Sequence, residues 1–384
     1  MNFYQKRRTT AALKQIHSGP ASRTIGRIGS RRRSFAPEAF SLLLESGQDR
    51  NKRAMNFSFT NAEDTLKTDT PEAWAFTNDL LEEQLEYFTR DSRIFKKYTY
   101  NLVNIEICTH CTSRCLYCPV SAAPQPGRIM SNKLFATILK KIGVLKPFRV
   151  CLNHYNEPLL DPAFLGKAAI LKERGIELVL FTNALLLSKT VIEGLVRLGN
   201  TSLVAVNLPS IEREEYARLT GIPITRNRLG ETLKNIKFAA KKGLDVRILV
   251  NGAPGPARKN YTEIKKYFGT AKSSPGVSLN LSHDRAGSVL SAEVKKSRRT
   301  TGFLGGCNRA ITSLSIDVSG KVFLCCQDYF KKNVFGDLTR QNLEDIIFSE
   351  KMISFKKNIF GYTLPDQEFI CRSCIEIRKK RAAA

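Results

Sequence analysis

Three closely spaced cysteines constrain this chain more than any other feature of its sequence. Cys111, Cys115 and Cys118 are separated by three and then by two residues, directly after an alternating apolar segment at residues 101–108. A short loop with this spacing can direct three thiolates at one metal centre. Three thiolates on a four-iron cluster leave one iron open for another ligand, whereas Cys108 as a fourth thiol would complete a zinc site. The spacing alone leaves both centres open.

A second set of cysteines follows much later in the sequence. Cys307 and Cys325 stand on either side of a segment whose pattern predicts a β-hairpin that turns at residues 318–320. Cys371 and Cys374 form a Cys-x2-Cys pair downstream. Because zinc and four-iron clusters both accept four such ligands, this set predicts a second metal centre of either kind.

Strand-like and helix-like segments alternate between the two cysteine sets. This alternation predicts an α/β fold with parallel strands and right-handed crossovers, either an incomplete barrel or an open doubly wound sheet. The polar loops that follow the strands should then gather at one edge. The predicted strands are residues 101–108, 148–154, 177–182, 201–207, 245–250 and 277–281, and the helices between them are predicted to start at Ser131, Asp161, Thr190, Arg226 and Asn260.

The composition is that of a soluble globular protein with a strong excess of positive charge. Lys and Arg number 61 against 35 Asp and Glu, which gives a formal net charge of +26. No apolar run approaches the about 18 residues of a membrane helix, and no apolar signal peptide is evident, so we expect reduced thiols and a cytoplasmic protein. The basic, acid-poor residues 1–53 also fit an organellar transit segment or a partner-binding arm.

The loop Cys111-Thr-Ser-Arg-Cys115-Leu-Tyr-Cys118 resembles the signature of radical S-adenosylmethionine (radical SAM) enzymes, including the aromatic residue before the third cysteine. The resemblance covers about residues 100–290 and implies a partial (β/α)6 TIM-like barrel. It also implies that the three cysteines hold a [4Fe-4S] cluster whose open iron binds the amino and carboxylate groups of S-adenosylmethionine. Reductive cleavage of that cofactor then releases a 5′-deoxyadenosyl radical, which abstracts hydrogen from the substrate.

The segment Tyr155-Asn156-Glu157-Pro158 falls where this family has a Gly-Gly-Glu-Pro motif that holds the cofactor's amino group. Both glycines are replaced, but Glu157 still offers a carboxylate to an ammonium. Two asparagines at the ends of the third and fourth predicted strands resemble positions that touch the cofactor's ribose or carboxylate, although asparagine also forms turns. The predicted cofactor contacts are Tyr117, Asn156, Glu157, Asn183 and Asn207.

The later cysteines resemble the twitch module, a shortened form of the SPASM extension of many radical SAM enzymes, which holds one auxiliary [4Fe-4S] cluster. A complete SPASM module has more cysteines and two clusters, whereas no cysteine follows Cys374 here. Four thiolates would close the cluster and favour electron transfer, with structural zinc as the alternative. Cys326 adjoins Cys325, and because neighbouring strand residues point oppositely, only Cys325 should face the cluster. The predicted ligands are Cys307, Cys325, Cys371 and Cys374.

These features predict three regions: a basic, partly disordered or helical extension at residues 1–95, the barrel at 96–294, and a small α+β iron–sulfur module at 300–384. We expect an oxidoreductase or related radical enzyme that oxidises or rearranges a sugar-like or cyclitol-like small molecule, with a peptide maturase as the alternative. His154, His283 and Arg285 lie on the predicted rim and are the polar candidates for catalysis.

The basic charge has two further interpretations. The basic surface can bind an acidic flavodoxin or ferredoxin that acts as electron donor. Alternatively, the chain is a non-enzymatic metal protein that binds nucleic acid through this surface. Nucleic acid is disfavoured because aromatic residues are not interleaved with the basic ones.

Overall fold

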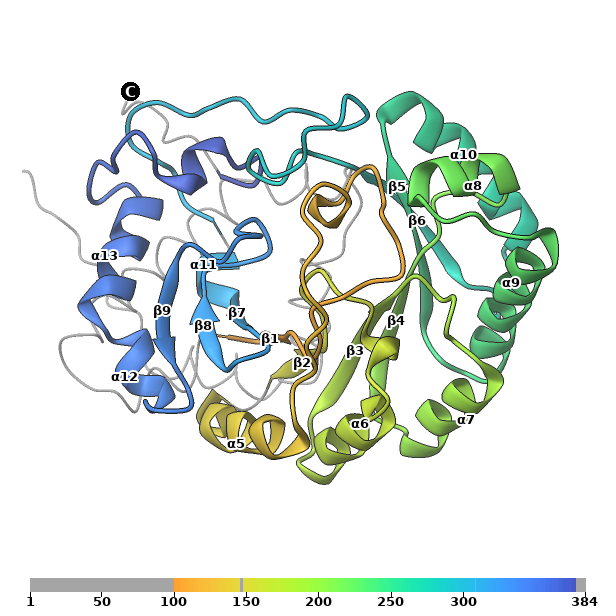
Figure 1. Ribbon diagram of the computed structural model, residues 1–384, viewed down its shortest axis with the longest axis horizontal. Coiled ribbons are helices and arrows are strands. Elements are labelled where there is room, and N and C mark those ends of the chain that lie inside the picture. Colours follow the sequence, from red (N-terminus) through yellow and green to blue (C-terminus); the bar gives the residue numbers. More distant parts are fainter. Residues whose placement is uncertain (1–99, 146–147, 308, 378–384) are drawn as a thin grey trace, which may run out of the picture. The chain divides into compact units, whose positions relative to one another are not determined.

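The computed structural model describes residues 100–145, 148–307 and 309–377 (Figure 1). The predicted extension at residues 1–95 lies outside these described residues. Nine strands form one sheet in the order β6-β5-β4-β3-β2-β1-β7-β8-β9, which confirms the predicted α/β fold. The strands are β1 Leu102–Ile105, β2 Arg149–Cys151, β3 Glu177–Thr182, β4 Thr201–Asn207, β5 Val246–Gly252, β6 Gly276–Leu281, β7 Ser313–Ile316, β8 Lys321–Phe323 and β9 Val334–Asp337.

Strands β1 to β6 pair in parallel in chain order, as the predicted strand–helix alternation requires. Alternating side chains on these strands enter two different apolar clusters. Val103 and Ile105 of β1 belong to the large core beneath the helices, whereas Leu102 joins Cys151 and Val179 in a smaller cluster. Because successive strand residues point to opposite faces, the smaller cluster marks the inner face of a partial barrel.

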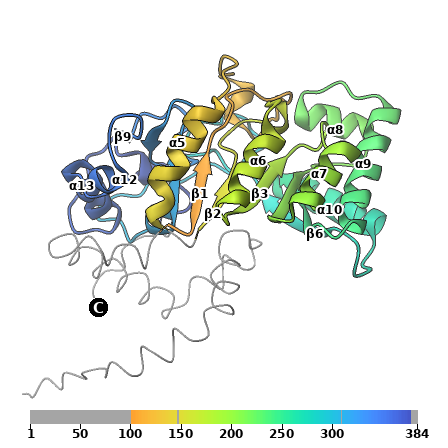
Figure 2. The same ribbon diagram turned by 90° about the horizontal axis from the view of Figure 1, so that it is seen from below.

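Helices α5, α6 and α7 lie side by side along the outer face of β1 to β3 (Figure 2). Further helices continue this layer beside β4 to β6 (Figure 1). The helices of the barrel are α5 Asn132–Ile142, α6 Phe164–Glu173, α7 Lys189–Leu198, α8 Arg213–Thr220, α9 Arg226–Lys241 and α10 Pro254–Phe268, and those that follow are α11 Arg309–Thr312, α12 Leu343–Ile347 and α13 Glu350–Ile359. In the part of the chain that the structure describes, no helix has the length and apolarity to cross a bilayer.

The helix starts show where local sequence rules hold. Ser131 caps α5 as predicted, because its hydroxyl accepts a hydrogen bond from the Leu134 amide at 3.2 Å. The predicted start of α6 at Asp161 is wrong, because the helix begins at Phe164. The Asp161 carboxylate accepts from the Ala163 amide at 2.8 Å with one oxygen and forms a buried ion pair with Lys167 at 2.7 Å with the other. The predicted capping box at Thr190 is also wrong, because Ser188 caps α7 two residues earlier.

The segment with the later cysteines continues the barrel sheet. β7 pairs in parallel with β1, with Leu102 opposite Ser313 and Ile105 opposite Ile316. β7 and β8 form the predicted antiparallel hairpin, and β9 pairs with β8. The residues of β7 enter the same apolar core as those of β1. The barrel and the module that follows it therefore share one sheet and one core.

The buried Asp161–Lys167 ion pair gives a test of the fold. Both side chains are 1% exposed, so Lys167→Ala leaves an uncompensated carboxylate in the interior and should cost about 3–5 kcal/mol. Urea unfolding followed by circular dichroism would show a lower midpoint. The control is Arg213→Ala, whose partner Glu214 is 75% exposed, and which should leave the midpoint nearly unchanged because surface ion pairs contribute little. Equal midpoints for both variants would contradict this assignment.

Candidate functional site

The loop with the first three cysteines follows β1 and is held by backbone hydrogen bonds. The Cys118 amide donates to the Cys115 carbonyl at 2.9 Å. Two amides of the loop donate to the end of α8, Arg114 to the Thr220 carbonyl at 2.7 Å and Leu116 to the Leu219 carbonyl at 3.0 Å. The loop is therefore fixed to the barrel before any metal binds.

Gly221 makes this contact between the loop and α8 possible. Its φ is 66°, in the left-handed region that glycine tolerates. A Cβ atom at this position would lie 2.9 Å from both the Cβ and the carbonyl oxygen of Arg114. Any larger residue at position 221 would therefore push the cysteine loop away from α8.

Burial raises the pKa of all three thiols in the loop. The pKa of Cys111 rises to about 11, and those of Cys115 and Cys118 also rise above their ordinary values. Charges on Cys111 and Cys118 add to the rise at Cys115, which shows that the three thiols are neighbours. Because thiolates are the ligands, cluster binding must displace these protons and is favoured at higher pH.

Cys108 is engaged away from this loop. Its thiol donates to the backbone carbonyl of Glu157 at 3.4 Å and accepts from the side-chain amide of Asn156 at 3.3 Å. Across residues 100–145, 148–307 and 309–377, no three Cys, His, Asp or Glu side chains are grouped closely enough to hold a single metal ion. The contacts of Cys108 thus give no support to its role as the fourth ligand of a zinc site.

Glu157 lies at the centre of a buried polar network and is 1% exposed. One carboxylate oxygen accepts from the Thr182 hydroxyl at 2.8 Å and the Leu159 amide at 3.2 Å, and the other accepts from the Asn183 amide at 2.7 Å. A carboxylate has about four acceptor sites, so one remains for a ligand donor. Burial raises the pKa of this carboxyl to about 7, and a neighbouring ammonium would favour its charged form.

Two predicted cofactor contacts have side chains bonded within the protein. The Asn183 amide nitrogen donates to the hydroxyls of Thr112 and Ser113 at 2.9 and 3.0 Å, which joins the end of β3 to the cysteine loop. Asn156 accepts from the His154 amide at 2.8 Å and donates to Cys108 and the Leu152 carbonyl. Asn156 therefore shapes the loop after β2, and a cofactor contact would have to replace one of these bonds.

A row of amides crosses the ends of the next strands. The Tyr117 hydroxyl donates to the Asn207 oxygen at 3.1 Å, and the same oxygen accepts from Asn251 at 2.8 Å. Asn280 donates in turn to Asn251. This row, from β4 through β6, joins the aromatic residue of the cysteine loop to the far side of the barrel.

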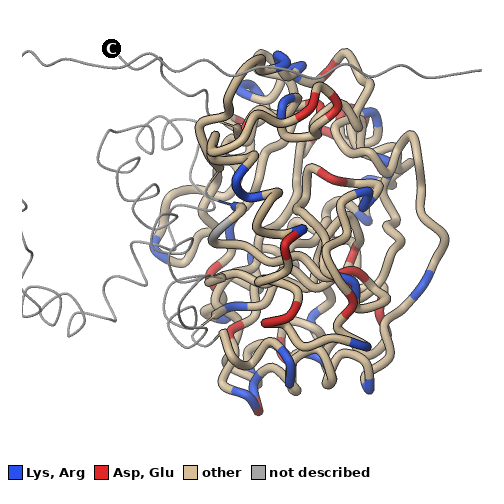
Figure 3. Tube along the Cα trace, turned by 90° about the vertical axis from the view of Figure 1, so that its left-hand side faces the viewer, with Lys and Arg blue, Asp and Glu red and all other residues tan. Residues whose placement is uncertain are grey.

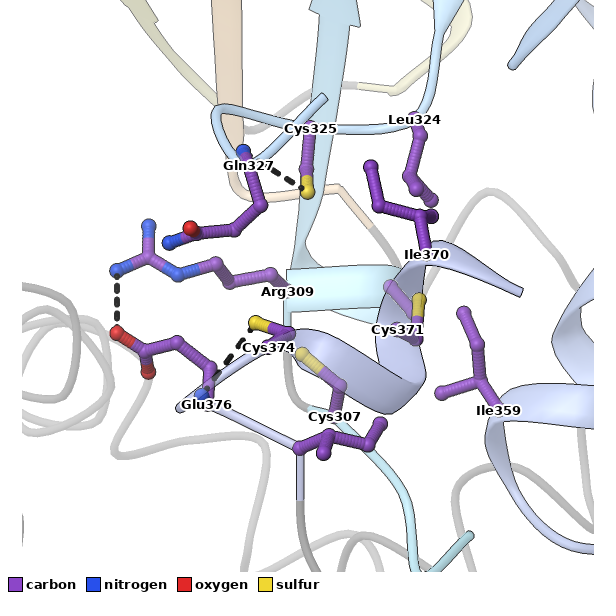
Figure 4. A pocket seen from close by; sticks show the side chains of 12 residues that line it. Cys307, Arg309, Leu324, Cys325, Gln327, Ile359, Ile370, Cys371, Cys374 and Glu376 are labelled. Atoms are coloured by element: carbon purple, nitrogen blue, oxygen red, sulfur yellow. Dashed lines mark hydrogen bonds and ion pairs between the residues drawn. The ribbon is translucent and has the colours of Figure 1, made fainter. Parts of the chain in front are cut away.

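The later cysteines surround one pocket (Figure 4). Cys307 precedes α11, Cys325 follows β8, and the short 3-10 helix η5, Ile370–Ser373, brings in Cys371 and Cys374. Four thiols that line one pocket are a donor set that fits a [4Fe-4S] cluster.

Backbone and side-chain groups hold these thiols in place. The amides of Gln327 and Glu376 donate to Cys325 and Cys374, each at 3.4 Å (Figure 4). The guanidinium of Arg372 is 1% exposed and fixes the turn between the last two cysteines. Its acceptors are the backbone carbonyls of Thr300, Gly302, Pro365 and Asp366, at 2.5–2.9 Å.

The three catalytic candidates lie on two loops. His154 follows β2, and its ring makes edge contacts with the rings of Tyr155 and Phe323, at distances of 4.6 and 4.7 Å between ring centroids. His283 follows β6 and accepts from the Arg285 amide at 3.2 Å. Burial lowers the pKa of His154 well below its ordinary value and that of His283 to about 4. Both imidazoles are therefore neutral near pH 7.

Comparison with known families gives two matches on separate parts of the chain. The family described as "Radical SAM superfamily" matches residues 105–268, and the family described as "Iron-sulfur cluster-binding domain", known as SPASM, matches residues 307–375. The two matches together cover more than half of the chain. The chain belongs to the radical SAM superfamily. It is therefore an enzyme that uses a [4Fe-4S] cluster with S-adenosylmethionine and carries a SPASM iron–sulfur domain, which rules out the non-enzymatic alternative.

Solved structures support the fold of this radical SAM enzyme. The SuiB protein of Streptococcus suis, bound to its precursor peptide SuiA, aligns with a TM-score of 0.56 and 12% identity over 88% of this chain and 84% of that one. SuiB bound to S-adenosylmethionine aligns with a TM-score of 0.51 and 12% identity, covering 87% of this chain and 84% of the other. BtrN in complex with AdoMet and 2-DOIA also aligns, with 16% identity over 68% of this chain and 88% of that one, but its TM-score of 0.47 is too low to bear on the fold. No curated protein matches the sequence.

Several residues of the site were missing from the candidates drawn from the sequence. Thr182 and Asn280 occupy strand positions that pattern analysis assigns to structure. Arginine is usually a surface residue, yet Arg309 lines the auxiliary pocket and Arg372 is buried between Cys371 and Cys374. One indication of these residues is present in the sequence: Thr182 and Asn251 lie at the carboxyl ends of predicted strands, where ligands of parallel sheets bind.

The close approach at Gly221 predicts the effect of one methyl group. Gly221→Ala should displace the cysteine loop and lower the iron content by about four per chain, the content of one cluster. The control is Gly230→Ala, because a Cβ there meets nothing within 4 Å. Iron analysis after anaerobic reconstitution measures both. Full iron in Gly221→Ala would show that the loop does not depend on this contact.

The raised pKa of Glu157 predicts a pH-dependent loss of cofactor affinity. Because Glu157 is predicted to hold the cofactor's amino group, we expect Glu157→Gln to remove a charge-assisted hydrogen bond worth about 1.5–3 kcal/mol, so S-adenosylmethionine should bind roughly tenfold to a hundredfold more weakly at pH 8. Below about pH 7 the wild-type carboxyl gains a proton, so the ratio between the two affinities should fall toward one at pH 6. Equilibrium dialysis at both pH values measures this ratio, with a substitution of the exposed Glu173, Glu173→Gln, as control. A ratio that is independent of pH would contradict the assignment.

Proposed function

We propose that this radical SAM enzyme abstracts hydrogen from a small sugar-like or cyclitol-like molecule and oxidises it, and that the SPASM pocket holds one auxiliary cluster that accepts an electron. The cluster and S-adenosylmethionine would supply the radical chemistry. The protein would bind the cofactor through Glu157, Tyr117, Asn183 and Asn207 and would exclude water from the reacting centre.

The observation that carries this proposal is the pocket of four thiols. Cys307, Cys325, Cys371 and Cys374 converge on one space (Figure 4). With four protein ligands each iron of a cubane has a thiolate, so no iron is open to a substrate. A closed cluster of this kind suits electron transfer, which an oxidation needs after hydrogen has been removed.

Two hydrogen bonds link the auxiliary module to loops of the barrel, one to the loop after β2 and one to the segment after the first cysteine loop. The Tyr155 hydroxyl donates to the backbone carbonyl of Cys326, next to the proposed ligand Cys325. The Tyr329 hydroxyl donates to the carbonyl of Ala123, shortly after Cys118. These contacts hold the auxiliary module against the barrel loops near both sets of cysteines, which supports the proposed transfer between the two centres.

A flavodoxin or ferredoxin is the proposed electron donor. Such proteins are acidic, and the net charge of this chain is +26. On the side of the molecule that contains α12 and α13, basic residues are interspersed with acidic ones (Figure 3). Docking of the donor should therefore weaken with salt.

A peptide substrate is the second candidate. The structure of SuiB that aligns with this chain was solved with its precursor peptide, and at 12% identity this likeness concerns the fold. Turnover of a peptide in preference to small polyols would favour this candidate.

Iron analysis and cofactor cleavage test the proposed function together. The reconstituted wild type should hold about eight irons per chain, as two four-iron clusters require, and should release 5′-deoxyadenosine from S-adenosylmethionine under reducing conditions. Cys374→Ala should lose about four irons and still release 5′-deoxyadenosine, because the first cluster remains. Cys108→Ala is the matched control and should retain all the iron. Four irons in the wild type would remove the auxiliary cluster, and no 5′-deoxyadenosine from a fully loaded protein would overturn the proposal.

A further inference from the structure

The segment after β6 lies against both cysteine centres. Val289 and Val294 pack in one apolar cluster with Cys115 and Tyr117 of the first loop. Ala286, on the same segment, packs against the apolar core that contains Cys371 and Cys374 of the SPASM pocket. The segment therefore contacts the surroundings of both cysteine centres. In the proposed reaction the substrate would lie between these centres.

This segment is locked in a strained turn. Arg285 and Ala286 have φ values of 50° and 51°, in the left-handed region that residues other than glycine rarely adopt. The turn is held by Asp284, whose carboxylate accepts from the amide and hydroxyl of Ser297 at 2.9 and 2.6 Å, and by the bond from the Arg285 amide to His283. Strain that the surroundings enforce at two successive residues is typical of functional sites.

The guanidinium on this turn lacks a partner. The Arg285 Nε is shielded from solvent and forms no hydrogen bond, and no carboxylate among the described residues forms an ion pair with this side chain. The Nε2 atom of His154 is likewise buried and unpaired. The two groups are neighbours, since the charge of Arg285 contributes to the low pKa of His154. Buried polar atoms without a partner require an explanation, and a bound ligand supplies one for both.

The charge balance around Arg285 indicates the ligand's charge. Arg309 is also close, but it pairs with Glu376 at 3.6 Å (Figure 4), and Lys331 pairs with Glu106. His154 and His283 are neutral near pH 7. No carboxylate of the described residues therefore matches the positive charge of Arg285, which suits an anionic ligand. A guanidinium offers parallel donors that fit the two oxygens of a carboxylate.

We propose that Arg285, with His154 beside it, binds a carboxylate of the substrate in the space between the two cysteine centres. This inference rests on the proposed function and narrows it: the substrate is an acid, such as a sugar acid or a carboxylate-bearing residue, rather than a neutral polyol. Arg285 then acts as a specificity-determining residue.

Binding of a matched pair of probes tests this inference. The full chain with both clusters and S-adenosylmethionine, kept oxidised so that no turnover occurs, is titrated by calorimetry at constant ionic strength with N-acetylglycine and with the neutral N-acetylglycinamide. The wild type should bind the acid at least tenfold more tightly than the amide. Arg285→Gln should lose this preference while iron content and S-adenosylmethionine affinity stay unchanged, and Arg285→Lys should retain part of it. The surface variant Arg213→Gln is the control and should keep the full preference.

Other results would overturn the inference. Equal binding of acid and amide by the wild type, or binding of neither, would show that no carboxylate site exists. A preference for the acid that persists in Arg285→Gln would place the site elsewhere. Loss of iron or of S-adenosylmethionine affinity in Arg285→Gln would assign the guanidinium to the cluster or the cofactor. Because calorimetry on the oxidised protein does not depend on cofactor cleavage, a failure here is distinct from a failure to form 5′-deoxyadenosine.

Discussion

The parallel pairing of β1 with β7 is the contact on which the rest of this molecule depends. β1 would otherwise be the edge of an open barrel sheet, with one row of backbone groups unpaired. Four register pairs with β7 satisfy that row, and the buried pair between Glu106 and Lys331 adds a charged contact just beyond β1. Separating the SPASM module from the barrel would expose both the sheet edge and the shared core. The two centres therefore hold a fixed relation that a flexible linker could not provide.

Desolvation governs the chemistry of the first site. The same burial that raises the pKa of Cys111 and Glu157 makes each group a stronger partner for positive charge once it has lost its proton. A cationic cofactor and a cluster of iron ions would both offset the desolvation of these buried negative charges. Asn183 donates from its side chain to Thr112 and Ser113 and from its backbone amide to Glu157. It therefore holds the cysteine loop and the Glu157 carboxylate in a fixed relative position before the cluster and the cofactor bind.

The sequence determined the strand positions well, because β3 and β4 begin and end at the predicted residues. It failed at α6 and α7, where tertiary contacts or a nearer hydroxyl took over the helix start: Asp161 meets Lys167, and Ser188 precedes Thr190. The cysteine spacings predicted two centres, although only the first set is local and the later one spans residues 307–374. The amide row from Asn207 to Asn280 and the burial of Arg372 depend on residues distant in sequence, and no local pattern encodes such pairings.

The clamp formed by Arg372 has a consequence for the order in which the protein matures. Its guanidinium closes the turn around Cys371 and Cys374 only when carbonyls from residues 300–302 and 365–366 are already in place. The first three cysteines, in contrast, lie in one loop that needs little more than the barrel around it. During synthesis the barrel loop can therefore receive iron early, whereas the SPASM pocket becomes competent for cluster delivery only after its last cysteines have left the ribosome.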